Sequence, residues 1–317
     1  MPPARIFSEV PQSFAQWQDA IQLSGNALHP NQQNTWGSGS NIQKEEYLLL
    51  RVLWSVKHKM DANARTDLGL KSQFQKASQW LHRFPPFNAY LQQVRTGKDV
   101  PKYDPDTDTH PWGSGVFEVT AREQHRLHLA LGSDDYSVPK SHLERLVDEE
   151  SVNTSLMVFL TALATKYPLI KGQWTPHQRF FGAEFKPGVP FNAKVDGYYT
   201  GKDDSLAILV EAKRSFRRAH EPSVSMQEAA EVVAWLKCDA AVHNRVRCII
   251  SQDGPEMYIT VASFDNTYLQ WLRSKRAISL PNGSFLTMTR YGPWLIQHER
   301  DVAEFAGIVL AIMASEK

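Results

Sequence analysis

The pattern of apolar and polar residues gives its clearest structural prediction at residues 191–218, in the sequence FNAKVDGYYTGKDDSLAILVEAKRSFRR. The apolar run at residues 206–210 is short and follows a turn signal, which predicts a buried strand. Residues 191–200 predict a second strand, and the polar residues 201–205 between the two predict a tight turn. The chain should therefore fold as a hairpin centred between Asp203 and Asp204, with a basic segment directly after it.

The rest of the C-terminal part alternates between helical and strand patterns. Ser141 is a candidate N-cap with Glu144 three residues later, and an apolar stripe predicts one helix from there to residue 166. Further strands are predicted at residues 179–185, 246–251, 256–264 and 285–294, and further helices at residues 223–237, 266–275 and 301–313. This order predicts an α/β fold in which helices cover both faces of a mixed central sheet.

Residues 1–137 are predicted to be a mainly helical region packed on a core formed by residues 138–317. An apolar stripe predicts a helix at residues 42–59, and residues 72–92 predict one or two helices interrupted at Pro85 and Pro86. Residues 99–115 are rich in proline and acid and predict a solvated loop. Since the sequence offers no flexible linker, we expect the N-terminal helices to wrap around the core.

Composition narrows the choice of partners. The 317 residues are 42% hydrophobic, enough for a sizeable core, but the formal net charge is only +1, so nucleic acid would have to bind a local basic patch. No apolar run reaches membrane-spanning length and no hydrophobic signal core follows the first residues. We therefore expect an intracellular protein, nuclear or cytoplasmic and not secreted. Cys238 and Cys248 have apolar neighbours, which predicts reduced core thiols.

The hairpin brings together residues of catalytic type. Folding about its turn pairs Asp196 with Glu211, whose Cβ atoms would lie about 5 Å apart. Glu211 and Lys213 share a face because strand side chains alternate. Neighbouring carboxylates repel unless a cation lies between them, and oxygen ligands favour Mg²⁺ or Mn²⁺ over zinc. With Lys213 holding a water or neutralising charge on a phosphate, the pattern predicts metal-assisted hydrolysis of a phosphodiester.

Simpler explanations of the same residues stay open. Glu184-Phe185-Lys186 repeats the spacing of acid and lysine with no aspartate facing it, which shows that the pattern also arises by chance. A surface ion pair at the end of a core strand would account for Glu211 and Lys213 equally well. A slip of one residue in the hairpin would turn Asp196 to the opposite face and remove the site.

The predicted order of helix, three strands, helix and strand places Val195-Asp196-Gly197 in the second strand and Glu211-Ala212-Lys213 in the third. This arrangement resembles the PD-(D/E)XK nuclease superfamily, although Val195 replaces that superfamily's proline. The resemblance implies a restriction-endonuclease-like fold in which Asp196, Glu211 and the main-chain carbonyl of Ala212 bind one or two Mg²⁺ ions. It also implies a glutamate from the preceding helix, for which Glu149 is the best match and Glu150 the second.

The resemblance extends over about residues 140–315. Some members, resembling the RecB branch, place a glutamine on the next helix, which would be Gln227, but Glu231 stands where that branch has a tyrosine. Several segments are also similar to a widespread group of uncharacterised fungal proteins; these are residues 148–153, 195–199, 211–213, 226–230 and 291–294.

Together these patterns predict a metal-dependent nuclease, with DNA rather than RNA as the expected partner. Contacts with nucleic acid are expected from Gln227 and Asn153 and, through the phosphates, from Arg214, Arg217 and Arg218. A solvated strand exit would also explain that basic run. The alternative function is a catalytically inactive nuclease-like fold that binds nucleic acid or protein. The sequence leaves the oligomeric state open.

Overall fold

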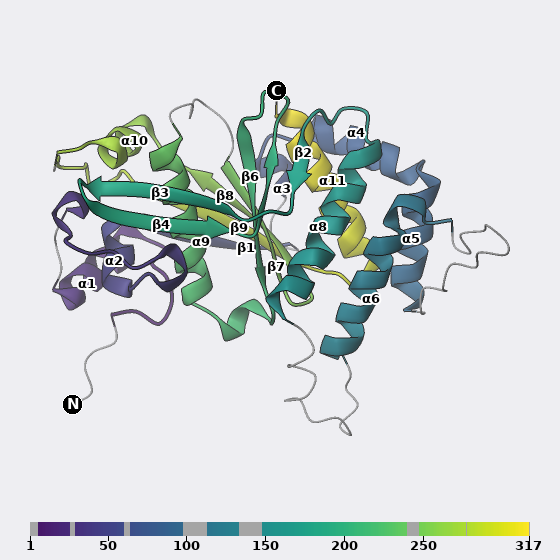
Figure 1. Cartoon of the computed structure of the whole chain (residues 1–317), viewed down its shortest axis with the longest axis horizontal. Helices are drawn as coiled ribbons and strands as arrows, with labels where there is room; N and C mark the ends of the chain where they lie inside the picture. Colours follow the sequence, from purple (N-terminus) through teal and green to yellow (C-terminus); the bar gives the residue numbers. More distant parts are fainter. Residues whose placement is uncertain are drawn as a thin grey trace, which may run out of the picture.

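The computed structural model describes residues 6–25, 29–59, 64–97, 113–132, 148–239, 247–276 and 278–316. Its centre is a seven-stranded sheet with strand order β1-β9-β8-β7-β6-β5-β2, and β3 and β4 form a separate two-stranded sheet (Figure 1). The sheet is mixed, because β1 runs parallel to β9 and β6 parallel to β7 while the other neighbours are antiparallel. The strands are β1 (Val52–His58), β2 (Gln173–Thr175), β3 (Arg179–Lys186), β4 (Val189–Val195), β5 (Gly197–Thr200), β6 (Leu206–Lys213), β7 (Arg247–Asp253), β8 (Glu256–Ser263) and β9 (Leu286–Leu295).

Helices cover both faces of the sheet, which confirms the expected α/β class (Figure 1). One layer consists of α4 (Lys71–His82), α5 (Pro85–Thr96), α6 (Glu118–Gly132), α8 (Glu149–Lys166) and α11 (Glu299–Ser315), with the short α3 (Ala64–Asp67) before α4. The other consists of α1 (Phe14–Ser24), α2 (Lys44–Leu49), α9 (Ser223–Cys238) and α10 (Asn266–Arg273), together with β3 and β4. Within the described ranges, no helix is both long and apolar enough to cross a membrane.

β6 lies inside the sheet, between β5 and β7, and carries apolar side chains on both faces. Ile208 and Val210 belong to the core formed with α8 and α11, whereas Leu209 belongs to the core formed with α9. Because successive side chains of a strand point to opposite faces, Glu211 shares the α9 side with Leu209. The strand therefore carries a carboxylate into the buried layer beneath α9.

The hairpin of β5 and β6 has the predicted register at the end where the charged residues lie. Gly197 pairs with Val210, so the residues one step further, Asp196 and Glu211, face each other as the turn predicts. Nearer the turn the register shifts between Tyr199 and Thr200, so the two strands are not symmetrical along their whole length.

Asp196 does not lie within a strand, contrary to the expectation. It forms a bend between β4 and β5, and β4 leaves the central sheet to pair with β3. A Cβ atom on the following Gly197 would meet Sδ of Met157 at 2.9 Å and the carbonyl oxygen of Thr175 at 3.0 Å. Glycine therefore lets the chain pass closely between α8 and β2 where it changes sheets.

The helix predicted at residues 42–59 is wrong. α2 ends at Leu49, Arg51 has a left-handed φ of 53°, and the chain then continues as β1 on the edge of the sheet beside β9. Val52 and Trp54 are buried while the residues that alternate with them are more exposed, which is the pattern of a strand. The N-terminal region thus adds a strand to the central sheet as well as helices.

The helix predicted from Ser141 onward begins later within the described residues. Asp148 is extended, and its Oδ1 accepts a hydrogen bond of 2.7 Å from the N–H of Ser151, so it caps an α8 that starts at Glu149. Ser141 itself and most of the loop predicted at residues 99–115 lie outside the described residues.

α4 and α5 confirm two helices separated at Pro85, and the strands and helices predicted after residue 222 are found within two residues of their expected bounds.

The two cysteines differ in exposure. Both are free thiols, but Cys248 is buried and Cys238 is exposed. The expectation of a reduced core thiol is therefore confirmed for Cys248, whereas Cys238 lies at the surface.

Candidate metal centre

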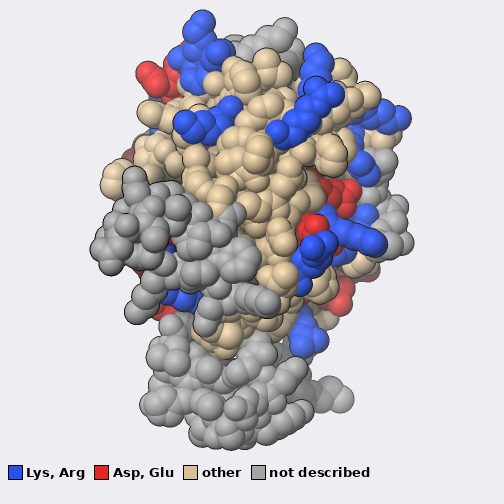
Figure 2. All heavy atoms as spheres, turned by 90° about the vertical axis from the view of Figure 1, so that its right-hand side faces the viewer, with Lys and Arg blue, Asp and Glu red and all other residues tan. Residues whose placement is uncertain are grey.

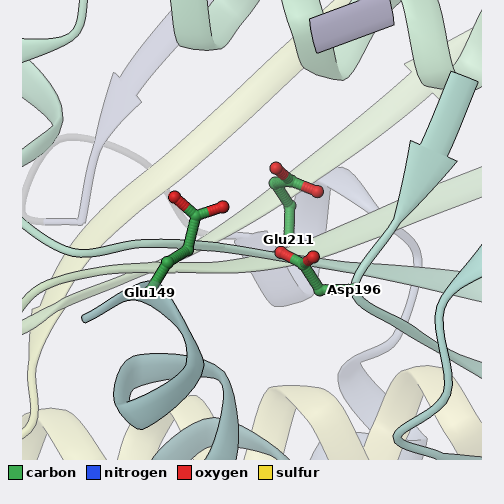
Figure 3. A group of neighbouring side chains, drawn as sticks. All are labelled: Glu149, Asp196 and Glu211. Carbon is green, nitrogen blue, oxygen red and sulfur yellow. The ribbon is translucent and has the colours of Figure 1, made fainter.

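Three carboxylates converge where β6 passes the first turn of α8 (Figure 3). Glu149 is the first residue of α8, Asp196 occupies the bend between β4 and β5, and Glu211 lies in β6. One oxygen atom from each carboxylate lies within 4.8 Å of the others. We call these residues the acidic triad. Glu211 is buried, Asp196 is half-buried and Glu149 is exposed, so the triad opens to solvent on the Glu149 side.

Asp196 is held in position by β6 and α8. Its N–H donates to the carbonyl oxygen of Val210 at 3.0 Å, and its Oδ2 accepts from the N–H of Ala212 at 3.0 Å. Nδ2 of Asn153 donates to its carbonyl oxygen at 3.3 Å. Burial raises the pKa of Asp196, and the hydrogen bond from Ala212 and the charge of Lys213 lower it in part. These contacts fix the carboxylate without using all of its acceptor capacity.

Glu211 has one paired and one unpaired carboxylate oxygen. Its Oε1 accepts from Nζ of Lys213 and from Nε2 of Gln227, both at 2.5 Å, while its buried Oε2 has no hydrogen-bond partner in the part of the chain that the structure describes. Burial raises the pKa of Glu211 to about 8; Lys213 counteracts this rise, and the neighbouring charge of Asp196 adds to it. A buried acceptor without a donor is costly, and a bound cation would satisfy it.

Lys213 bridges two members of the acidic triad. Its Nζ lies 2.5 Å from Oε1 of Glu211 and 3.2 Å from Oε1 of Glu149, and its side chain is 13% exposed. Burial opposes its charge, but the two carboxylates outweigh burial and raise the pKa of Lys213 above its ordinary value. Lys213 is therefore an ammonium ion on the same face as Glu211, where the sequence places it.

α9 supplies a polar pair behind Glu211. Nε2 of Gln227 also donates to Oε1 of Glu231 at 2.9 Å, and both side chains are buried. Oε2 of Glu231 has no hydrogen-bond partner among the residues described, and burial together with the charge of Glu211 raises the pKa of Glu231 well above its usual range. No role was predicted for Glu231 from the sequence, although its spacing of four residues from Gln227 places both side chains on one face of α9.

The residues expected to contact nucleic acid divide into two groups. Gln227 and Asn153 are buried, and their amides contact Glu211 and Asp196 inside the site. Their expected contact with a ligand stays a prediction, whereas their contact with the acidic triad is direct.

Arg217 is buried in an ion cluster, so the expectation that it contacts phosphate is wrong. Its Nε donates to Oδ2 of Asp253 at 2.5 Å and its Nη1 to Oε2 of Glu228 at 3.1 Å. Arg214 and Arg218, in the segment that follows β6, are exposed at the surface.

The acidic triad could hold a hard divalent cation. Its potential ligands are all carboxylate oxygens, which suit Mg²⁺ or Mn²⁺ better than zinc. Within the described residues, the buried Oε2 of Glu211 accepts no hydrogen bond, so this carboxylate has spare acceptor capacity. The N–H of Ala212 is occupied by Asp196, and the role of the Ala212 carbonyl as a ligand stays a prediction.

The second copy of the acid and lysine pattern forms no comparable cluster among the described residues. Glu184 is exposed on β3 and pairs with Pro190, while Nζ of Lys186 donates to Oδ1 of Asn34 at 2.7 Å. This pair therefore provides a matched control for the residues of the acidic triad.

In comparisons with known proteins, the chain matched no family model and no curated protein sequence.

Proposed function

We propose that the protein is a Mg²⁺- or Mn²⁺-dependent nuclease that hydrolyses phosphodiester bonds, built on a restriction-endonuclease-like core formed by residues 138–317. The observation that carries the proposal is the convergence of Glu149, Asp196 and Glu211 beside Lys213. Acids that repel one another are costly to hold at one point unless a cation neutralises them. The resemblance of the Asp196 and Glu211 segments to the PD-(D/E)XK pattern supports the same proposal.

The roles that we propose follow from burial and reach. Asp196 and Glu211 would hold the ion, and the exposed Glu149 would complete its ligands or accept a proton. A bound Mg²⁺ would polarise the scissile phosphate and lower the pKa of a bound water. Lys213, which is charged and reaches both glutamates, would orient the attacking water or neutralise charge that develops on the phosphate.

The charge distribution supports local contact with phosphates. On the face drawn in Figure 2, Lys and Arg side chains lie mostly toward the top and one edge, acidic residues stand among them, and the centre is uncharged. This face has no continuous basic surface, in keeping with the net charge of +1. We expect phosphate contact from a few exposed cations, including Arg214 and Arg218 after β6, and such contact would carry no sequence information. DNA is the first substrate to test and RNA the second.

A catalytically inactive binding module is the second candidate, because Lys213 already contacts two carboxylates. Such an ion pair can complete the end of a strand without a metal ion. On this alternative the fold would present a surface for nucleic acid or protein, and divalent ions would bind weakly.

Calorimetric titration with Mn²⁺ and cleavage of single-stranded, duplex and branched DNA and of RNA distinguish the two functions. Asp196→Asn keeps the shape of the side chain and should abolish both the Mn²⁺ heat and cleavage. Glu184→Gln, which removes a carboxylate from the second copy of the pattern, should leave both unchanged. Equal and negligible heats for wild type and Asp196→Asn would favour the binding module.

Lys213→Met tests the proposed chemistry separately from metal binding. We expect the variant to keep a Mn²⁺ heat but to cleave roughly 100-fold more slowly, because positioned charge next to the reacting phosphate is lost. Cleavage at the wild-type rate would contradict the role of Lys213.

A further inference from the structure

Two phenylalanines are exposed near the acidic triad, one on β3, which pairs with the strand that leads to Asp196, and one shortly after β6. Phe180 in β3 is 62% exposed, and Phe216, shortly after β6, is 37% exposed. Burying a phenylalanine is favourable, so two exposed rings beside one site are a feature to explain. A single exposed apolar residue is ordinary, but each of these rings has an exposed cation beside it.

Phe180 lies next to an exposed lysine, Lys194, on the strand that leads to Asp196. It pairs with Lys194 across β3 and β4, so the two side chains stand on the same face with Cβ atoms about 5 Å apart. Lys194 is exposed and precedes Asp196 by two residues, about 7 Å of extended chain. Its charge acts on Asp196, whose pKa it lowers in part. Phe180 and Lys194 thus form an aromatic and cationic pair close to the acidic triad.

The outward direction of Phe180 is set by the ribbon of β3 and β4. Phe181, Ala183 and Phe185 alternate with it and are buried against α9, so the ribbon already has an apolar inner face. Phe180 belongs to the other face, where its neighbours across the strand pair are polar. The ring is therefore not part of either core and remains available to a ligand.

Phe216 repeats this combination beyond β6. It follows Lys213 by three residues, and the guanidinium carbon of Arg218 lies 5.7 Å from the centre of its ring. Arg214 and Arg218 are exposed, while Arg217 between them points inward. The segment thus presents a ring and two cations to solvent and uses its remaining arginine for internal packing.

Exposed rings that alternate with cations match the chemistry of single-stranded nucleic acid. Every base has a π-face that can stack on an aromatic side chain, and cations between the rings follow the phosphates. In a duplex these faces are covered by neighbouring bases, and a base must be unstacked before a side chain can reach it. A purely electrostatic duplex-binding surface would need the cations but not the rings.

We propose that the substrate of this site is a single strand of nucleic acid whose bases, on either side of the scissile phosphate, stack on Phe180 and Phe216. Lys194 on one side and Arg214 and Arg218 on the other contact the flanking phosphates. This inference rests on the proposed nuclease function, since it assigns the substrate class of the same site.

Binding without divalent ions and cleavage with Mn²⁺ test the inference. Fluorescence polarisation in EDTA would compare a labelled DNA strand, its RNA counterpart and the DNA duplex. We expect the full chain to bind the single strands at least about tenfold more tightly than the duplex, and Phe180→Ala or Phe216→Ala to weaken single-strand binding about tenfold. Phe180→Trp, which keeps an aromatic ring at this position, should bind the single strands as tightly as wild type. Val56→Ala removes an exposed apolar side chain from β1, on the distant edge of the sheet, and should change nothing.

The results separate the inference from the proposed function. A wild type that cleaves none of the substrates with Mn²⁺ would overturn the nuclease function. A wild type that cleaves single strand and duplex equally, or a folded Phe180→Ala that binds and cleaves single strands like wild type, would overturn the inference alone. Loss of binding in Lys194→Ala with full binding in both phenylalanine variants would likewise leave only electrostatic contact and overturn it.

Discussion

Gln227 on α9 holds Glu211 on β6: its Nε2 lies 2.5 Å from Oε1 of Glu211 and 2.9 Å from Oε1 of Glu231. One amide nitrogen therefore separates two buried carboxylates and orients the one that belongs to the acidic triad. Groups that hydrogen-bond to metal ligands fix the ligand's position and influence metal affinity.

Gln227→Leu should weaken Mn²⁺ binding by roughly tenfold, because Glu211 loses one of its two hydrogen-bond donors, keeps only Lys213, and faces Glu231 without an amide between them. Isothermal titration measures the change, with Gln270→Leu on the exposed face of α10 as the control. If Gln227→Leu bound Mn²⁺ as tightly as the control, the amide would have no role in shaping the site.

Gly197→Ala should destabilise the fold by about 1–3 kcal/mol, because the added methyl group would overlap Met157 and the backbone of Thr175. Urea unfolding of the metal-free protein gives the free energy of unfolding. Gly182→Ala is the control, since its nearest neighbour, Cε1 of Phe180, lies at an ordinary contact distance of 3.4 Å. Equal stability of the two variants would show that the space between α8 and β2 at Gly197 can accommodate a methyl group.

Burial of Glu211 predicts a loss of stability toward alkaline pH in the metal-free protein. Its pKa is raised from 4.5 to about 8, so between these values the folded protein retains a proton that the unfolded chain releases. The contribution of Glu211 to stability is therefore present below the unfolded pKa and is lost as pH rises through about 8. Urea unfolding in EDTA should show a steeper decline for wild type than for Glu211→Gln. Parallel declines would contradict the raised pKa.

The part of the site that could be predicted from sequence depends on local patterns. The polar turn at residues 201–205 and the alternation of apolar residues fix which residues face each other, and the pairing of Gly197 with Val210 confirms that register beside Asp196 and Glu211. Glu149 could be reached only through the resemblance, because nothing local places the start of α8 against β6.

Other features depend on contacts that sequence alone does not show. The apolar run after Leu49 fits a short strand as well as a helix. In the structure the left-handed φ of Arg51 ends the helix, and the following residues pair with β9 as a strand. Likewise, β4 and β5 separate at Asp196, where the next residue, Gly197, packs tightly against Met157 and Thr175. Arg217 looks like its basic neighbours in sequence, and its burial is set by acids that come from other segments of the chain.

Arg217 should be a stabilising residue, in contrast to its exposed neighbour Arg218. Its guanidinium donates to Asp253, Glu228 and Ser251, all of them buried. Removing one partner of a buried ion pair leaves an uncompensated charge, so we expect Arg217→Met to lower the free energy of unfolding by about 3–5 kcal/mol. Arg218→Ala should leave stability within about 0.5 kcal/mol of wild type, because its side chain is at the surface.

The same two variants separate stability from nucleic-acid binding. At a temperature where both are folded, Arg218→Ala should bind a single strand more weakly and show a shallower dependence of affinity on salt, because one phosphate contact is lost. Arg217→Met should keep the wild-type salt dependence, since the buried guanidinium contacts no phosphate. Unfolding curves and binding titrations at several salt concentrations measure both effects. If the salt dependence were reduced in Arg217→Met and unchanged in Arg218→Ala, Arg217 and not Arg218 would contact the phosphate. That result would contradict the burial of Arg217 in the ion cluster.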